Sequence, residues 1–170
     1  LYSPYFSGSK IRWLLDNVPQ VSDGVAKGDL VFGTIDTYMV YKLTGGKAIV
    51  TDVTNASRYM LMNIKTQKWD PELLEIFGVK EESLPEIVSS SGVIYGYTDP
   101  DGPFKASIPV CGILGDQQAA LFGQACFDKG SSKCTYGTGC FMLANVGEDV
   151  CYSKHGLITT VGYRIEGEKP

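Results

Sequence analysis

The first half of the chain places apolar residues at helical spacing. In the first such stretch they occupy positions i, i+3, i+4 and i+7, namely Ile11, Leu14, Leu15 and Val18. This spacing puts them on one face of a helix, so the pattern predicts a helix over residues 7–18 with that face buried. Ser7 or Ser9 is expected to cap its start, because a hydroxyl can accept a hydrogen bond from the first-turn N–H groups. Pro19 follows its end.

The same patterns predict further elements. Helices are expected over residues 34–43 and 70–77, and a short polar helix or loop over residues 20–29. Short strands are expected over residues 30–32, 48–51, 59–64 and 93–98, and a short acidic turn or helix over residues 81–88. Asp70 suits the cap position of the helix that begins at Pro71, and Gly78 suits its end.

An apolar run that stops at a Gly-Asp pair and then becomes helical is the most informative stretch. Residues 108–114 suit a buried strand, and residues 116–123 suit a packed helix. Gly115 lets the backbone turn between them. Asp116 would then stand at the carboxyl end of a strand, where open α/β folds bind ligands. The alternative is a structural role, since Asp is also a favoured helix N-cap.

A second glycine-containing feature lies further along the chain. Residues 133–144 predict a strand, a turn at Gly137, Thr138 and Gly139, and a second strand. Such a turn exposes backbone N–H groups around a hydroxyl and can cradle phosphate oxygens. An ordinary tight hairpin is the alternative explanation.

Strand and helix patterns alternate through most of the chain, which is typical of an α/β fold. Near residues 123–130 the pattern changes to strands and turns only, and it continues so through residues 157–162. This change is a candidate domain boundary.

Composition narrows the classes of function. The formal net charge is −4 at pH 7 and no block of Lys and Arg occurs, which argues against a nucleic-acid partner. No apolar run approaches the roughly 20 residues that cross a bilayer, and no signal peptide opens the chain.

The cysteines and the histidine do not suggest a metal or a His-based catalytic scheme. The 5 cysteines are Cys111, Cys126, Cys134, Cys140 and Cys151. None forms a Cys-x-x-Cys pair and their number is odd, so we expect buried free thiols in a reducing cytosol. His155 is the only histidine and lies in a polar turn, where we expect it at the surface.

Several segments together resemble the FGGY carbohydrate kinase family, in the actin, hexokinase and Hsp70 ATPase superfamily. Residues 115–124 resemble the catalytic segment of the members that act on glycerol, and residues 136–143 resemble their phosphate loop. The first family signature fits residues 5–17, and residues 32–37 and 51–58 are further landmarks. These segments keep the family's order over nearly all of the chain. The Gln-Gln pair after Asp116 distinguishes these members from pentulose kinases.

The resemblance implies a partial actin-like/ribonuclease H-like ATPase fold of the α/β class. Residues 1–125 would form the C-terminal half of the N-terminal lobe, on the acceptor side. Residues 126–170 would form the first β-hairpins of the C-terminal lobe, on the nucleotide side. The active site would lie between the two lobes.

For the acceptor side, the resemblance implies phosphorylation of glycerol to sn-glycerol 3-phosphate. Asp116 would be the catalytic base and would also contact the acceptor. Gln117 and Tyr5 would position the acceptor. The segments around Asp36 and Asp52 are also family-like, but a capping or ion-pair role explains these carboxylates, together with Asn55 and Arg58, at least as well.

For the nucleotide side, the resemblance implies that Thr138 contacts the phosphates of ATP. Gly137 and Gly139 would shape the turn and contribute N–H groups. ATP and Mg²⁺ are the expected cofactors, with most ligands of the metal outside this chain. A homodimer or homotetramer in the cytoplasm is expected for the intact enzyme, with glycerol and ATP as its ligands and no membrane span.

The family's first phosphate loop, its Arg-Glu pair and its adenosine pocket do not occur in these 170 residues. We therefore expect the chain alone to be inactive. Two alternative functions stay open. One is another FGGY kinase that acts on a different polyol or sugar, and the other is a non-catalytic actin-like fragment that binds nucleotides or partners.

Overall fold

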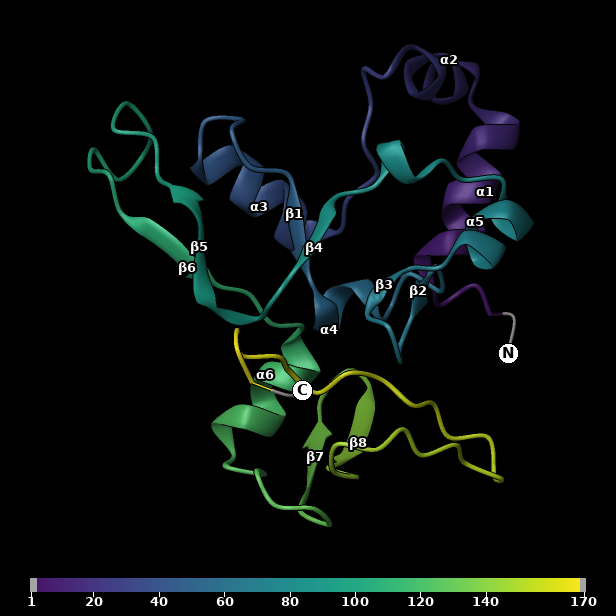
Figure 1. Cartoon of the computed structure of the whole chain (residues 1–170), viewed down its shortest axis with the longest axis vertical. Coiled ribbons are helices and arrows are strands. Elements are labelled where there is room, and N and C mark those ends of the chain that lie inside the picture. Colours follow the sequence, from purple (N-terminus) through teal and green to yellow (C-terminus); the bar gives the residue numbers. More distant parts are fainter. Residues whose placement is uncertain (1–2, 169–170) are drawn as a thin grey trace.

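The computed structural model describes residues 3–168 as a mixed α/β structure (Figure 1). The helices are α1 (Ser7–Asn17), α2 (Pro19–Lys27), α3 (Ile35–Leu43), α4 (Val53–Ala56), α5 (Pro71–Phe77) and α6 (Asp116–Gly123), with a 3₁₀ turn at Glu81–Ser83. The strands are β1 (Val50–Asp52), β2 (Met62–Asn63), β3 (Lys68–Trp69), β4 (Glu86–Val88), β5 (Ser91–Tyr97), β6 (Pro109–Gly112), β7 (Ser132–Tyr136) and β8 (Cys140–Ala144). The predicted α/β class is confirmed.

The strands pair two by two. β1 and β4 are parallel, with Asp52 opposite Val88, and the other pairs are antiparallel: β2 with β3, β5 with β6, and β7 with β8. In Figure 1 the β1–β4 pair lies between the β5–β6 pair and the group of α1, α2 and α5. The parallel pair therefore occupies the middle of the molecule, and α4 begins directly at the end of β1.

Two apolar cores hold these elements. The larger core joins α1, α4, α5 and the β2–β3 pair, and includes Ile11, Val53, Ala56, Tyr59, Leu61, Trp69, Leu74 and Phe77. The smaller core packs α3 and β1 beneath the end of β6, through Val40, Ala48, Val50 and Ile113. Ile113, a member of the smaller core, lies just before α6 in the sequence, so this core supports the residues that lead into that helix.

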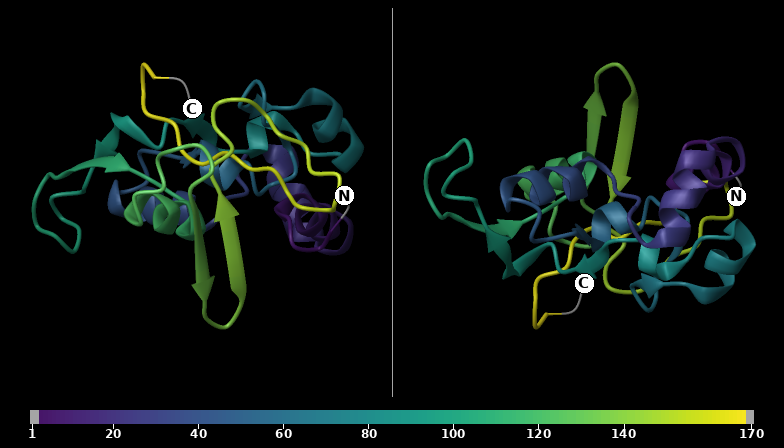
Figure 2. Two further views of the ribbon diagram at one scale, coloured as in Figure 1. Left: turned by 90° about the horizontal axis from the view of Figure 1, so that it is seen from below. Right: turned by 90° about the horizontal axis from the view of Figure 1, so that it is seen from above.

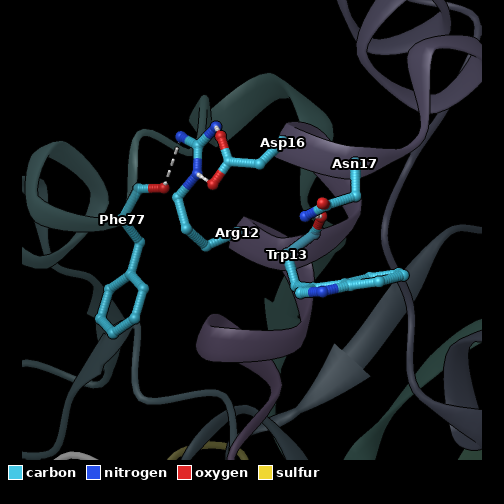
Figure 3. Close-up of polar contacts among 5 residues, drawn as sticks. All are labelled: Arg12, Trp13, Asp16, Asn17 and Phe77. Atoms are coloured by element: carbon cyan, nitrogen blue, oxygen red, sulfur yellow. Dashed lines mark hydrogen bonds and ion pairs between the residues drawn. The ribbon is translucent and has the colours of Figure 1, made fainter.

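Polar contacts fix the outer side of α1 against the end of α5 (Figure 3). Arg12 Nη1 donates to the carbonyl of Phe77 at 3.2 Å, and Arg12 Nε donates to Asp16 Oδ2 at 3.0 Å. The Phe77 carbonyl belongs to the last turn of α5, so the cation meets an acceptor at a helix C-terminus. Asn17 Nδ2 donates to the carbonyl of Trp13 at 2.8 Å. The Trp13 ring is 60% exposed, so it lies at the surface.

The predicted helices are confirmed with small differences at their ends. α2 ends at Gly28, which takes a left-handed conformation with φ 76°, and α5 is capped by Asp70, which accepts from Glu72 N at 3.0 Å. The predicted serine cap of α1 is wrong. The N-cap position belongs to Phe6, whose side chain makes no capping bond, and Ser9 Oγ instead donates to the Phe6 carbonyl at 3.1 Å.

The strands expected over residues 48–51, 59–64 and 93–98 form as β1, β2 and β5 with shifted ends, whereas other strand predictions were wrong. Residues 30–32 form no strand. Phe32 makes a single backbone hydrogen bond there, from its N to the Ser83 carbonyl at 2.8 Å, and its side chain packs into the larger core. Of the acidic turn or helix expected over residues 81–88, Glu81–Ser83 forms a 3₁₀ turn as predicted, whereas residues 86–88 form β4, which pairs with β1. Residues 157–162 also form no strand. The buried strand expected over residues 108–114 is shorter and largely exposed as β6, and the buried Ile113 follows directly after it.

The segment around residues 160–166 returns to the first part of the chain. Thr160 Oγ1 lies 2.7 Å from Ser57 Oγ, and Ser90 N donates to the Arg164 carbonyl at 2.8 Å. Gln118 Nε2 donates to the Val161 carbonyl at 3.4 Å. Ile165 also forms an isolated parallel bridge with Ser91, but the pairing extends no further, so the segment does not become a strand.

The cysteines differ from expectation in their burial. All five are free, but only Cys126 is buried. Cys111, Cys134 and Cys140 are exposed because the strands that carry them belong to two-stranded pairs with open faces, and Cys151 is exposed outside any strand. Within residues 3–168, no helix is long and apolar enough to span a membrane.

Candidate functional site

Asp116 is the first residue of α6. Gly115 takes the N-cap position with φ −61° and ψ 147°, so the alternative that Asp116 caps this helix is wrong. Asp116 Oδ1 accepts a hydrogen bond from Gln117 N at 2.8 Å, and the side chain is exposed. The carboxylate is therefore free to meet a ligand from solvent.

A hydrogen bond to α4 holds the backbone just before Asp116. Gly115 N donates to Thr54 Oγ1 at 2.8 Å, and Thr54 is fully buried. A Cβ added at Gly115 would lie 2.7 Å from Gln118 Oε1, so the Gln118 side chain would have to move. The hydrogen bond to Thr54 thus holds the point at which α6 begins.

Asp52 organises the layer below Thr54. It is fully buried at the end of β1 and accepts from Thr54 N at 3.1 Å, Thr54 Oγ1 at 2.8 Å, Asn55 N at 3.0 Å and Ser90 Oγ at 2.7 Å. We call this set of Asp52, Thr54, Asn55, Ser90 and Gly115 the Asp52 network. The predicted capping role of Asp52 is confirmed, since it caps α4. A buried carboxylate with this many donors is a structural group rather than a free base.

Asp36 is likewise occupied by structural contacts. Its Oδ2 accepts from Thr51 Oγ1 at 2.7 Å, and its Oδ1 accepts from Thr34 Oγ1. It therefore links the first turn of α3 to β1.

Two tyrosines beside these carboxylates have raised pKa values. Burial raises the pKa of Tyr95 to about 12, and the charge of Asp52 adds to that shift. Its hydroxyl donates to the Ser89 carbonyl at 2.7 Å. Burial is also the main cause that raises the pKa of Tyr59, to which the charge of Asp36 contributes. Both phenols therefore stay protonated well above neutral pH.

Gln117 contacts a buried lysine that the sequence analysis missed. Lys133 is only 3% exposed, and its Nζ donates to Gln117 Oε1 and, at 2.9 Å, to Thr135 Oγ1. Lys133 and Thr135 are two positions apart in β7, so they lie on the same face of the strand. This spacing before the glycine turn was visible in the sequence, but it did not reveal that α6 covers that face.

Tyr5 lies just before α1 in the chain. Its ring is 54% exposed and packs edge-on against Phe6, with centroids 5.4 Å apart. The guanidinium of Arg58 lies 5.0 Å from the Tyr5 centroid and 4.9 Å from that of Phe6. Arg58 therefore makes cation–π contacts rather than the expected ion pair.

The predicted strand–turn–strand unit forms the β7–β8 hairpin, with Tyr136 opposite Cys140. Figure 2 shows this hairpin projecting from the rest of the molecule, and the exposed turn lies at its free end. Gly137 N donates to the Gly139 carbonyl at 3.1 Å, so this N–H is used within the turn. A Cβ at Gly139 would meet the Phe141 ring at 2.7 Å. A role of Thr138 in binding phosphate stays a prediction.

The predicted site residues thus fall into three places. Asp116 and Gln117 stand together at the start of α6, above the Asp52 network and beside the base of β7. The turn that carries Thr138 lies at the other end of that hairpin, and Tyr5 lies next to α1. Two surface hollows of about 480 and 440 Å³ lie beside β4, and none of these residues lines either hollow.

No group of three or more His, Cys, Asp or Glu side chains that could hold a metal occurs in the described part of the chain. Asp116 and Asp52 therefore do not form a metal centre with residues of this kind. The single histidine, His155, is exposed, as expected.

Comparisons with known proteins agree on one family. The sequence model described as the FGGY family of carbohydrate kinases, N-terminal domain, matches residues 1–123. The chain is 54% identical over 168 residues to a protein named glycerol kinase from Geobacillus sp. (strain WCH70), covering 99% of this chain and 34% of that one. It is 56% identical over 164 residues to a glycerol kinase of Carboxydothermus hydrogenoformans, covering 96% of this chain and 33% of that one.

Solved structures show the same relationship. The crystal structure of Plasmodium falciparum glycerol kinase with ADP matches with a TM-score of 0.94 and 45% identity, over 99% of this chain and 34% of that one. A xylulose kinase from Lactobacillus acidophilus matches with a TM-score of 0.64 and 24% identity, over 81% of this chain and 27% of that one, and supports the fold alone. The partial actin-like ATPase fold is confirmed. The chain spans about a third of the length of the curated relatives it matches.

Proposed function

Because the chain belongs to the FGGY family of carbohydrate kinases, we propose that the complete protein carrying it phosphorylates glycerol with ATP and yields sn-glycerol 3-phosphate. The observation that carries this proposal is the 54% identity to a glycerol kinase over 99% of the chain. The structural match to a glycerol kinase with a TM-score of 0.94 supports it.

In this proposal Asp116 is the general base. A glycerol hydroxyl is a poor nucleophile until its proton begins to leave, and a carboxylate placed within hydrogen-bonding distance can accept that proton. Oδ1 of Asp116 already accepts from Gln117 N at 2.8 Å, whereas Oδ2 has only a long contact of 3.5 Å with Gln117 Nε2. Oδ2 is therefore the oxygen assigned to the proton.

Gln117 and Tyr5 are proposed to position the acceptor. The amide Nε2 of Gln117 can donate to a second hydroxyl of glycerol, next to the base. Tyr5 offers an exposed ring face and a hydroxyl. It would reach the acceptor from the side of α1, where Arg58 supports its ring.

Thr138 is proposed to hold phosphate oxygens through its hydroxyl, and Gly137 and Gly139 to shape the turn around it. The turn is exposed, so a phosphate could reach the Thr138 hydroxyl, and Gly139 leaves room for the Phe141 ring. The Gly137 N–H is bonded to the Gly139 carbonyl within the turn. Mg-ATP supplies the phosphoryl group when it is bound. As the resemblance to the family implies, most ligands of the metal are assigned to other parts of the protein.

A cytoplasmic location and a homodimeric or homotetrameric state are also proposed. The five free cysteines support a reducing compartment. Light scattering of the purified complete protein would measure its assembly, and a monomer would contradict the second part.

The test is a substrate panel on the complete protein, with ADP release as the readout. We expect the highest kcat/KM with glycerol, and we expect the phosphorylated product to be sn-glycerol 3-phosphate. A higher kcat/KM for another polyol or for a ketose sugar would instead favour a different FGGY kinase. Nucleotide binding without any turnover would favour a non-catalytic fragment or relic, and would refute the proposal.

A further inference from the structure

Lys133 is buried in a way that requires compensation. Lysine rarely loses its water unless its ammonium group is paired or fully hydrogen-bonded. At 3% exposure, Lys133 Nζ donates to the neutral oxygens Gln117 Oε1 and Thr135 Oγ1. The first of these acceptors belongs to the start of α6 and the second to β7 itself.

This contact determines which way the Gln117 amide faces. An ammonium group has only hydrogens to offer, so it selects the oxygen of an amide and rejects the nitrogen. With Oε1 held by Lys133, Nε2 is turned to the other side, where it lies 3.5 Å from Asp116 Oδ2. Lys133, Gln117 and Asp116 thus stand in series.

We propose that Lys133 is a positioning residue for the acceptor site, because it orients the Gln117 amide so that Nε2 faces Asp116 and the acceptor. This inference rests on the proposed function. It assigns Gln117 the role of donor, so the hydroxyl that it meets accepts, while the reacting hydroxyl gives its proton to Asp116.

The position of Lys133 gives it a second consequence. It lies near the start of β7, and the same hairpin carries the turn with Thr138 at its free end. The short strand β7 therefore connects Lys133, which orients Gln117, to the turn with Thr138, the predicted phosphate contact. A change in the tilt of the hairpin would move Lys133 relative to Gln117.

The experiment uses Lys133→Met in the complete protein, since methionine keeps most of the length and removes every donor. We expect KM for glycerol to rise by about tenfold to a hundredfold, the scale on which a misplaced binding group acts. KM for ATP should stay within about twofold. The matched control is Lys154→Met, because Lys154 is exposed and outside this series, and it should leave both constants unchanged.

A double-mutant cycle separates positioning from a general loss of structure. If Lys133 acts through Gln117, then adding Lys133→Met to Gln117→Ala should raise KM for glycerol no further. Additive effects, or an equal rise in KM for ATP, would overturn the inference. Normal glycerol kinetics in Lys133→Met would overturn it while leaving the proposed function intact. An unmodified protein that neither binds nor phosphorylates glycerol would overturn both.

A second variant covers the case in which Lys133→Met does not fold. Thr135→Val removes one of the two acceptors of Lys133 and keeps the charge. We expect a smaller rise in KM for glycerol than in Lys133→Met, with a cooperative melting transition. An unchanged KM for glycerol in a folded Thr135→Val protein would count against the inference.

Discussion

The Asp52 network and the β7–β8 hairpin hold their polar groups in opposite ways. In the network, Asp52 and Thr54 have no exposed surface, and each makes several hydrogen bonds. At the tip of the hairpin the residues of the turn are all exposed, and two strands alone support them. Only the base of the hairpin is anchored, through Lys133.

This difference suggests a division of labour in the proposed reaction. A general base must stay within a few tenths of an ångström of its position, and the Asp52 network provides that rigidity to the backbone before Asp116. A group that closes on a phosphate must be able to move, and a two-stranded hairpin with an exposed turn is suited to that. Variants in the two regions should therefore affect different quantities.

The largest effect is expected at Asp116, where the network meets solvent. In the complete protein, Asp116→Asn should lower kcat by roughly 10²–10⁴-fold, because the amide cannot accept the proton. The melting temperature should stay the same, since Asp116 is exposed and its carboxylate bonds to the neighbouring Gln117. Asp128→Asn is the control at another exposed aspartate. Near-normal kcat in Asp116→Asn would refute the assignment of the base.

The next effect is on stability and comes from Asp52. Asp52→Ala should lower the free energy of unfolding by about 2–4 kcal/mol, because it removes a helix cap and leaves buried N–H and O–H donors without acceptors. Urea denaturation of the complete protein measures this. The exposed Asp29→Ala should change it by less than about 0.5 kcal/mol. Equal effects of the two variants would show that the network does not stabilise the fold.

In the hairpin the expected effect is on ATP alone. Thr138→Val should raise KM for ATP by about tenfold to a hundredfold, because a hydrogen bond to a charged oxygen contributes about 1.5–3 kcal/mol. The melting temperature and KM for glycerol should not change, since Thr138 is exposed at the end of the hairpin. Thr66→Val, at another exposed turn, is the control. A rise in KM for glycerol instead would place Thr138 on the acceptor side.

The smallest effect concerns pH and Tyr95, beside the network. Its pKa is raised from 10.0 to about 12 in the folded protein, so between these values the unfolded chain loses this proton while the folded protein keeps it. Stability therefore falls as pH rises from 10 toward 12. In Tyr95→Phe this part of the fall should disappear, and melting temperatures between pH 9 and pH 11 would reveal it. Parallel curves for the two proteins would contradict the assignment.

Local patterns predicted most helices and most strands, and they missed elements such as β4 for a physical reason. α1, α3 and α5 depend on side chains three and four positions apart, and those spacings are visible in the sequence. β4 is only three residues long, and it exists because it pairs with β1, which lies far earlier in the chain. Its acidic start at Glu86 conceals that pairing, so no local pattern could have identified it.

The sequence predicted the site residues whose positions depend on local backbone structure. It did not predict the features that depend on which residues are buried by distant elements. The turn at Gly115 placed Asp116 at the start of a helix, as expected from the sequence. The occupation of Gly137 N–H and the burial of Lys133 could not be read from residue types, because both depend on how the hairpin closes and on what covers its base.

The hydrogen bonds around Ser90 also bear on how the protein folds. Ser90 Oγ donates to Asp52, 38 positions earlier, and accepts from Arg164 N, 74 positions later, at 3.2 Å. Contacts that close such long loops carry a large entropic cost and tend to form after the local helices. We therefore expect substitutions at Ser90 to speed unfolding while hardly slowing folding. The hydrogen bonds of Ser90 would then determine the lifetime of the native state rather than the folding rate.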